Sequence, residues 1–173
     1  MKLIVTCPRH FESETGEEIS KILENLGDSE HEIFDTGLPG IISIETLLDS
    51  TVVINEIREK IREEPWKIRY LLRIIPIQSE TETELNKILK AVNNLIGKFE
   101  ENHTYRITVE KRHANVSSKD IISTIANSIK NKVSLENPDW IILVEVLGNR
   151  SGISVLKSGE ILSVMKEKRK LSE

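Results

Sequence analysis

Cysteine, aromatic residues and long apolar runs are scarce in this sequence. The single cysteine, Cys7, excludes an internal disulfide framework. Aromatic residues make up only 4% of the chain, so isoleucine, leucine and valine must fill the interior. The apolar run Trp140–Val144 is far shorter than the roughly 20 residues of a membrane span. The apolar start, Met1–Thr6, is interrupted at Cys7 and Pro8, which is too short for a signal peptide. We therefore expect a cytoplasmic protein without a membrane span.

Groups that carry catalysis are equally sparse. Cys7 and His10 could form a thiol–imidazole pair or half of a metal site, but a zinc site would need two more ligands at suitable spacing. Small thiols are also common in protein cores, and His31, His103 and His113 are scattered along the chain. No glycine-rich phosphate loop links a strand to a helix. We expect no enzyme activity, no metal and no cofactor; a small enzyme with an unrecognised site near Cys7 and His10 is an alternative.

Charge is unevenly distributed along the chain, whose formal net charge is −4. Residues 1–75 carry nine Lys and Arg against 15 Asp and Glu, whereas residues 104–173 carry 12 against eight. A polyanion should therefore meet the C-terminal third first. An ordinary soluble surface with a modest surplus of lysine would give the same count.

The first part of the chain has a pattern typical of a ferredoxin-like domain, which we place at residues 1–76. Thr15 and Glu18 have the spacing of a capping box at a helix start, and Gly27 suits the end of that helix. The turn Gly37–Gly40 separates two short strands. The resulting order is strand, helix, strand, strand, helix, strand, over residues 2–6, 15–26, 32–35, 41–45, 50–64 and 68–75.

A second α/β domain is predicted at residues 77–165, after a connector that begins at Pro76. A capping box at Thr81 and Glu84 predicts a long amphipathic helix, and Ser117 with Asp120 predicts another. Tyr105–Lys111 alternates as a strand does, and two further strands flank the loop Gly148–Gly152. The remaining residues, 166–173, read as a charged and frayed tail. The predicted fold class is thus α/β (α+β), in two domains.

A basic stretch at the end of the alternating strand is the strongest candidate for a binding site. Lys111 and Arg112 end the strand, Asn115 follows in the loop, and Ser118 and Lys119 open the next helix. A helix N-terminus favours phosphate binding, and Lys and Arg contacts to phosphate supply most non-specific affinity for nucleic acid. Alternatively, Lys111 and Arg112 are charges that keep an edge strand from aggregating.

The second half of the chain resembles a THUMP domain. The resemblance rests on a series of segments, which comprise Leu72–Ile77, Tyr105–Arg112, Ser117–Ile122, Val133–Trp140 and Gly148–Leu156. In the first half, Thr6–Arg9 and Phe34–Gly40 are similar to the small stand-alone members of this family. Many THUMP proteins carry a ferredoxin-like domain just before the THUMP domain, so the resemblance covers most of the chain.

The resemblance implies a tRNA-binding protein without catalytic activity of its own. THUMP domains bind the acceptor end of tRNA, including its 3′ terminus, and are commonly fused to a tRNA-modifying enzyme. The present form resembles the adaptors that help an RNA cytidine acetyltransferase act on tRNA. The family's basic pair maps to Lys111 and Arg112, and we add Asn115, Ser118 and Lys119 on physical grounds. Because the first half is acidic, a protein-interaction module that has lost RNA binding is a further alternative.

Overall fold

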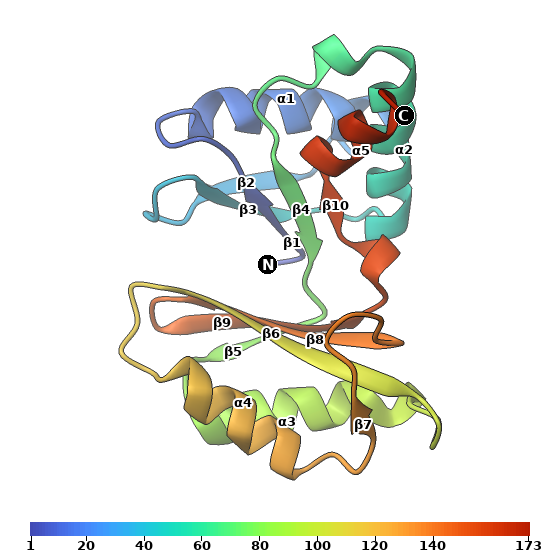
Figure 1. The fold of residues 1–173 in the computed structure, drawn as a ribbon. Helices are drawn as coiled ribbons and strands as arrows, with labels where there is room; N and C mark the ends of the chain where they lie inside the picture. Colours follow the sequence, from blue (N-terminus) through green and yellow to red (C-terminus); the bar gives the residue numbers. More distant parts are fainter. The chain divides into compact units, whose positions relative to one another are not determined.

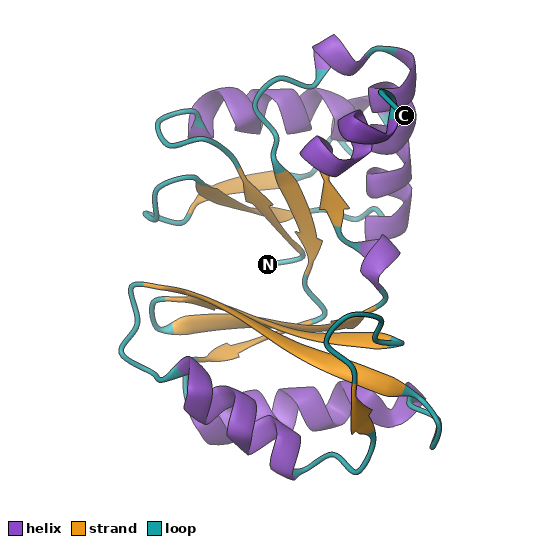
Figure 2. Cartoon of the chain, in the orientation of Figure 1, coloured by secondary structure: helices purple, strands orange, loops and turns teal.

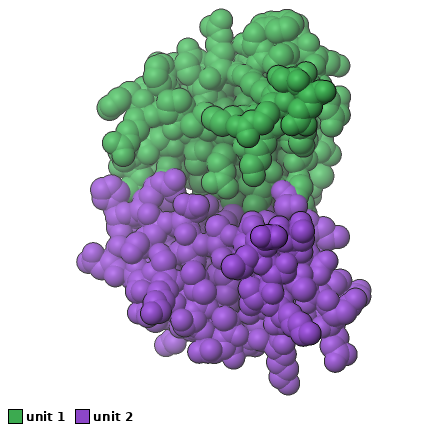
Figure 3. Space-filling model, in the orientation of Figure 1, with its two compact units in different colours: residues 1–76, 159–173 green, residues 77–158 purple.

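The computed structural model describes all 173 residues, which form two compact units (Figure 3). The first unit comprises Met1–Pro76 together with Gly159–Glu173, and the second comprises Ile77–Ser158. Each unit contains its own five-stranded sheet and helices (Figure 2). The predicted α+β class is therefore confirmed.

The first unit has the ferredoxin-like order of elements. These are β1 (Leu3–Thr6), α1 (Glu12–Asn25), β2 (Glu32–Asp35), β3 (Ile41–Glu45), α2 (Ser50–Glu63), the short 3-10 helix η1 (Pro65–Lys67) and β4 (Arg73–Pro76). The sheet has the strand order β10-β4-β1-β3-β2 with antiparallel pairs throughout, β10 being Leu162–Ser163. Helices α1 and α2 cover one face of the sheet (Figure 1). The core lies between that face and the helices, where alternate strand residues such as Leu3 and Val5 pack with Ile19 and Ile57.

Helix α1 begins earlier than its sequence predicts. The predicted capping box at Thr15 and Glu18 is wrong, because the helix starts at Glu12 and the Thr15 hydroxyl donates to the Phe11 carbonyl oxygen. The Glu18 carboxylate instead accepts hydrogen bonds from three consecutive backbone N–H groups at residues 69–71. The predicted end is confirmed: Gly27 has a φ of 95°, and the Asp28 N–H donates to the Leu23 carbonyl oxygen.

The last 15 residues form ordered structure in the first unit, so the prediction of a frayed tail is wrong. Strand β10 pairs with β4, and helix α5 (Val164–Lys170) packs on α2. The Ser163 hydroxyl caps α5, and Glu167 forms an ion pair with Arg58, at 3.3 Å between Oε1 and Nε. The tail is held by two apolar residues, Leu162 and Val164, which are both buried in the core of the unit. The many charged residues that follow them dominate the sequence pattern of this segment.

The second unit is built on a mixed sheet with the strand order β5-β9-β8-β6-β7. Its elements are β5 (Ser79–Glu82), α3 (Leu85–Leu95), the 3-10 helix η2 (Ile96–Lys98), β6 (Thr104–Arg112), α4 (Ser118–Asn127), β7 (Lys132–Val133), β8 (Trp140–Leu147) and β9 (Arg150–Leu156). The 3-10 helix η3 (Ser158–Glu160) follows, where the chain passes back into the first unit. Strands β6 and β8 run parallel, whereas β8 and β9 form an antiparallel hairpin. Helices α3 and α4 cover one face of the sheet (Figure 1).

Strand β5 corrects two predictions for the start of this unit. Residues Ser79–Glu82 pair antiparallel with β9 instead of forming a connector, and α3 begins at Leu85 with Glu84 as its N-cap. The capping box at Thr81 and Glu84 is therefore wrong. The hairpin loop is also shorter than the predicted Gly148–Gly152, because β9 already begins at Arg150. None of the helices has the length and apolar character that a membrane-spanning segment requires.

Candidate nucleic-acid interface

The predicted basic pair ends strand β6, and the sheet sends its two side chains to opposite faces. Tyr105, Ile107 and Val109 pack into the core beneath α3 and α4, so Lys111 continues on this helix-covered face. The Lys111 ammonium donates to the Val116 carbonyl oxygen at 3.0 Å, directly before the start of α4. An ammonium group has three donors, so this contact leaves Lys111, which is exposed, able to bind a phosphate as well.

Arg112 lies on the other face of the sheet and is half-buried. Its guanidinium Nη1 is 3.7 Å from Oε2 of Glu145 on β8, a carboxylate that is only 1% exposed. Arg112 therefore helps to balance a buried charge, and this role sets it apart from Lys111. The sequence predicts both cations at one edge of the sheet; the structure places them at the same strand end but does not bring them onto one face.

Helix α4 starts as the sequence predicts, next to the end of β6. The Ser117 hydroxyl accepts a hydrogen bond from the Asp120 N–H at 3.3 Å, which confirms Ser117 as the N-cap. Ser118 and Lys119 are the first two helical residues, and their N–H groups have no acceptor within the helix. Lys119 and Asn115 are exposed. The structure thus brings Lys111, Ser118 and Lys119 together around one helix N-terminus, with Asn115 in the adjoining loop.

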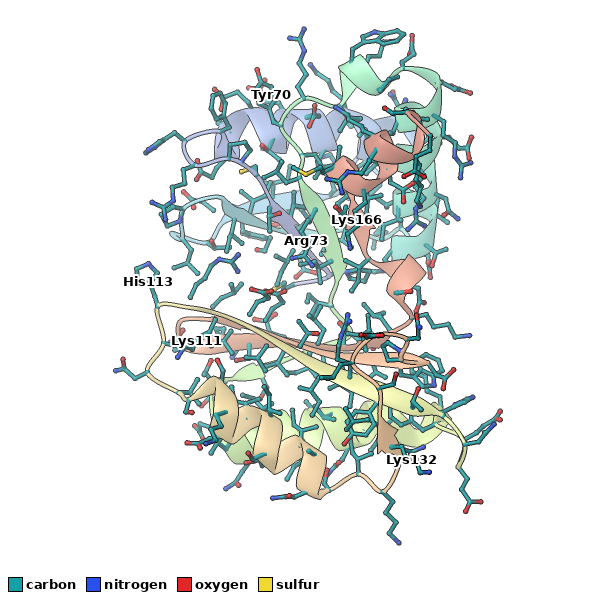
Figure 4. The ribbon with its side chains drawn as sticks, viewed as in Figure 1. Tyr70, Arg73, Lys111, His113, Lys132 and Lys166 are labelled. Atoms are coloured by element: carbon teal, nitrogen blue, oxygen red, sulfur yellow. The ribbon has the colours of Figure 1, made fainter.

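Two further residues of the same unit lie near the two ends of strand β6. His113 is exposed with a φ of 50°, and Figure 4 shows it at the tip of the loop that follows Lys111. Its place directly after the basic pair was the available signal. Lys132 lies on β7, opposite Thr104 at the start of β6, so it marks the other end of this strand. There Lys130 and Lys132 line a cavity of about 530 Å³ with His103 and Thr104.

The start of β6 is fixed to the start of β8 by polar and aromatic contacts. The Asp139 carboxylate accepts hydrogen bonds from the Thr104 backbone N–H and hydroxyl, which lower the pKa of Asp139 below its usual value. Trp140 stacks on Phe99 at 5.8 Å between ring centroids, and its indole N–H donates to Nδ1 of His103. These contacts hold the parallel pair in register, so they set the position of Lys111 at its far end.

The alternative site near Cys7 and His10 lacks the features of an activated cysteine. Cys7 is buried, and this burial raises the pKa of its thiol, whereas catalytic cysteines have a lowered pKa. No group of three or more His, Cys, Asp or Glu side chains is arranged to hold a metal ion.

The sequence of the second unit also matches a known domain family. Residues 82–156 fit the sequence model of the THUMP domain. This part of the chain is a THUMP domain. An uncharacterized protein of Methanocaldococcus jannaschii is 27% identical over 178 residues, which cover all of this chain and 46% of that protein. The chain thus spans about half the length of this relative.

Solved structures share the fold of the whole chain at low sequence identity. PH1313 of Pyrococcus horikoshii superposes with a TM-score of 0.64 at 17% identity, over 94% of this chain and 55% of that one. TrmN of Thermus thermophilus gives 0.61 at 15% identity, over 88% and 44%. A 4-thiouridine synthetase, solved with RNA and ATP, gives 0.51 at 13% identity, over 94% and 42%. These likenesses show that the fold of this chain recurs in other proteins.

Proposed function

We propose that this THUMP-domain protein binds tRNA at its acceptor end, and that it presents the tRNA to a separate modifying enzyme. The observation that carries the proposal is the cationic start of α4 in the THUMP domain. Lys111, Lys119 and the free N–H groups of a helix N-terminus together make a site that matches a phosphate group in charge and in hydrogen bonding.

The comparisons support RNA as the ligand. The 4-thiouridine synthetase that shares the fold was solved as an RNA complex, and the THUMP model covers the segment that carries Lys111, Arg112, Asn115, Ser118 and Lys119. The THUMP unit carries 11 Lys and Arg against ten Asp and Glu, so its charge is balanced overall. Affinity for RNA therefore depends on where the cations gather and not on net charge.

The adaptor role rests on the chemistry of the described side chains. The buried thiol of Cys7 is poorly suited to nucleophilic attack, and the exposed cations suit phosphate contacts. An RNA cytidine acetyltransferase is the modifying enzyme we favour as partner. In this scheme the protein contributes position and electrostatic attraction, and the partner enzyme contributes the reaction.

A binding assay with purified tRNA tests this function. Replacing Lys111 and Lys119 together by alanine should weaken tRNA binding by about tenfold at low salt, because each lost phosphate contact lowers the affinity electrostatically. Lys90→Ala is the matched control, since Lys90 is an exposed lysine on α3 of the same domain. Equal affinities for all three proteins would contradict the proposed site, and failure of the wild type to bind tRNA would contradict the function.

A further inference from the structure

The ferredoxin-like unit exposes a group of aromatic side chains in a protein that has few of them. Of the seven aromatic residues in the chain, Phe11, Trp66 and Tyr70 come from two adjoining loops of this unit. The rings of Phe11 and Tyr70 stack, with 5.3 Å between centroids and 18° between planes. Trp66 lies in η1, four residues before Tyr70, in the segment that links α2 to β4. Figure 4 labels Tyr70 at this end of the unit.

Two of these rings are exposed, whereas Tyr70 is half-buried. Trp66 is 66% exposed and Phe11 is 41% exposed. The indole of Trp66 stacks on no other ring, and its N–H has no acceptor in the protein, whereas both needs are met for Trp140 in the THUMP domain. Burying a large apolar side chain stabilises a fold by about 1.5–3 kcal/mol. Aromatic side chains therefore usually bury most of their surface. Trp66, which is 66% exposed, therefore contributes little to stability.

Cations alternate with the rings along the same segment. The sequence Trp66-Lys67-Ile68-Arg69-Tyr70 places Lys67 and Arg69 on the surface and buries only Ile68. Arg9, two residues before Phe11, is exposed as well. Lys67 forms an ion pair with Glu64, whereas the side chains of Arg9 and Arg69 form no ion pair within the protein. Flat aromatic faces beside arginines are the chemistry by which proteins hold unpaired nucleic-acid bases and the phosphates between them.

The segment is held in place before any ligand binds. The Glu18 carboxylate on α1 accepts from the N–H groups of Arg69, Tyr70 and Leu71, at 2.6, 3.2 and 2.9 Å. From the C-terminal helix, the Lys168 ammonium donates to the Ile68 carbonyl oxygen at 2.6 Å. A rigid platform loses little conformational entropy on binding, which favours a binding role over a mobile surface loop.

We propose that Phe11, Trp66 and Tyr70 form a stacking surface for unpaired bases of single-stranded RNA, with Arg9 and Arg69 contacting the adjoining phosphates. The inference rests on the proposed function, because it gives the ferredoxin-like unit its own contact with an RNA that the THUMP domain also binds. Bases inside a duplex already stack on one another, so this surface selects single-stranded segments. The unit itself carries more Asp and Glu than Lys and Arg, and this limits its non-specific attraction to the phosphate backbone of a duplex.

Tryptophan fluorescence during titration with an unstructured single-stranded RNA tests the inference. A base stacked on Trp66 should quench its emission, and Trp66→Phe should lose this quenching while binding within about threefold of the wild type, since a phenyl ring still stacks. Trp66→Ala should bind about tenfold more weakly, a change of about 1.4 kcal/mol and within the range for one stacked base. Leu47→Ala is the matched control, because Leu47 is an 81% exposed apolar side chain of the same unit.

A blunt-ended RNA duplex and vesicles of phosphatidylcholine with phosphatidylserine complete the experiment. Binding of the duplex should be the same for the wild type and Trp66→Ala. Unchanged single-strand affinity of Trp66→Ala, or quenching by vesicles and not by RNA, would overturn the stacking surface. If the wild type binds RNA in a Lys111-dependent manner while Trp66 has no effect, only the present inference fails. If the wild type binds no RNA, the proposed function fails with it.

Discussion

Leu162→Ala is expected to lower the free energy of unfolding of the first unit by about 2–5 kcal/mol, the range for a leucine removed from a packed core. Leu162 has no exposed surface and lies on β10 opposite Ile74 of β4. Its side chain joins the core that α1 and α2 cover. Chemical denaturation followed by circular dichroism measures the change.

The control for this prediction is a leucine from the same C-terminal segment. Leu171 follows α5 and is 46% exposed, so Leu171→Ala should change stability by less than about 0.5 kcal/mol. If Leu162→Ala unfolds at the same denaturant concentration as the wild type, the last residues are not part of the ferredoxin-like core.

Gly40→Ala should destabilise the same unit by about 2–5 kcal/mol, through two effects that add. Gly40 has a φ of 76°, where an L-residue costs about 1–2 kcal/mol. A Cβ atom at this position would also lie 2.7 Å from the Cys7 carbonyl oxygen, and crowding of this kind costs about 1–3 kcal/mol. The backbone cannot simply move away, because the Cys7 N–H donates to the Gly40 carbonyl oxygen at 2.9 Å.

Gly37→Ala separates the two effects. Gly37 has a similar φ of 72°, but a Cβ atom there would meet nothing within 4 Å. It should therefore show only the conformational cost of about 1–2 kcal/mol. Thermal melts of both variants give the comparison, and equal destabilisation would mean that the close approach to Cys7 is relieved at no cost.

The order of elements could be predicted from the sequence because it depends on local apolar patterns. Isoleucine-rich strands and helices with apolar residues at every third or fourth position gave the ferredoxin-like order of the first unit. Gly27 and Ser117 were read correctly as helix ends because their roles depend on neighbouring residues alone. The fold class could also be predicted, because it follows from the order of these locally determined elements.

Features that depend on distant partners could not be predicted in this way. Ser79–Glu82 contains no apolar residue, and it is a strand only because β9 lies beside it. Glu18 was assigned to a local cap, but its partners are the N–H groups of residues 69–71. The C-terminal tail looked charged and frayed because its ordering depends on Leu162 and Val164 reaching the core of the first unit.

The candidate site contains one feature that depends on neighbouring residues and one that depends on a distant partner. Lys111 was placed correctly beside the start of α4, because a strand end and a capped helix follow each other in the sequence. The ion pair of Arg112 with Glu145 joins two neighbouring strands, and no local pattern reports it. The alternation of β6 does indicate that adjacent residues face opposite ways, and this signal could have separated the two cations.

The salt dependence of tRNA binding tests the central claim most directly, namely that cations at the end of β6 contact RNA phosphates. Each lost contact should reduce the slope of log affinity against log salt concentration by roughly 0.7–0.9. Lys111→Ala should show a reduction of this size, and Arg112→Ala a smaller one, because Arg112 is half-buried and pairs with the buried Glu145. Thermal melts must accompany the titration, because Arg112 also pairs with the buried Glu145. Slopes and affinities equal to those of the wild type, with the fold intact, would contradict the claim and leave these cations as solvated edge charges.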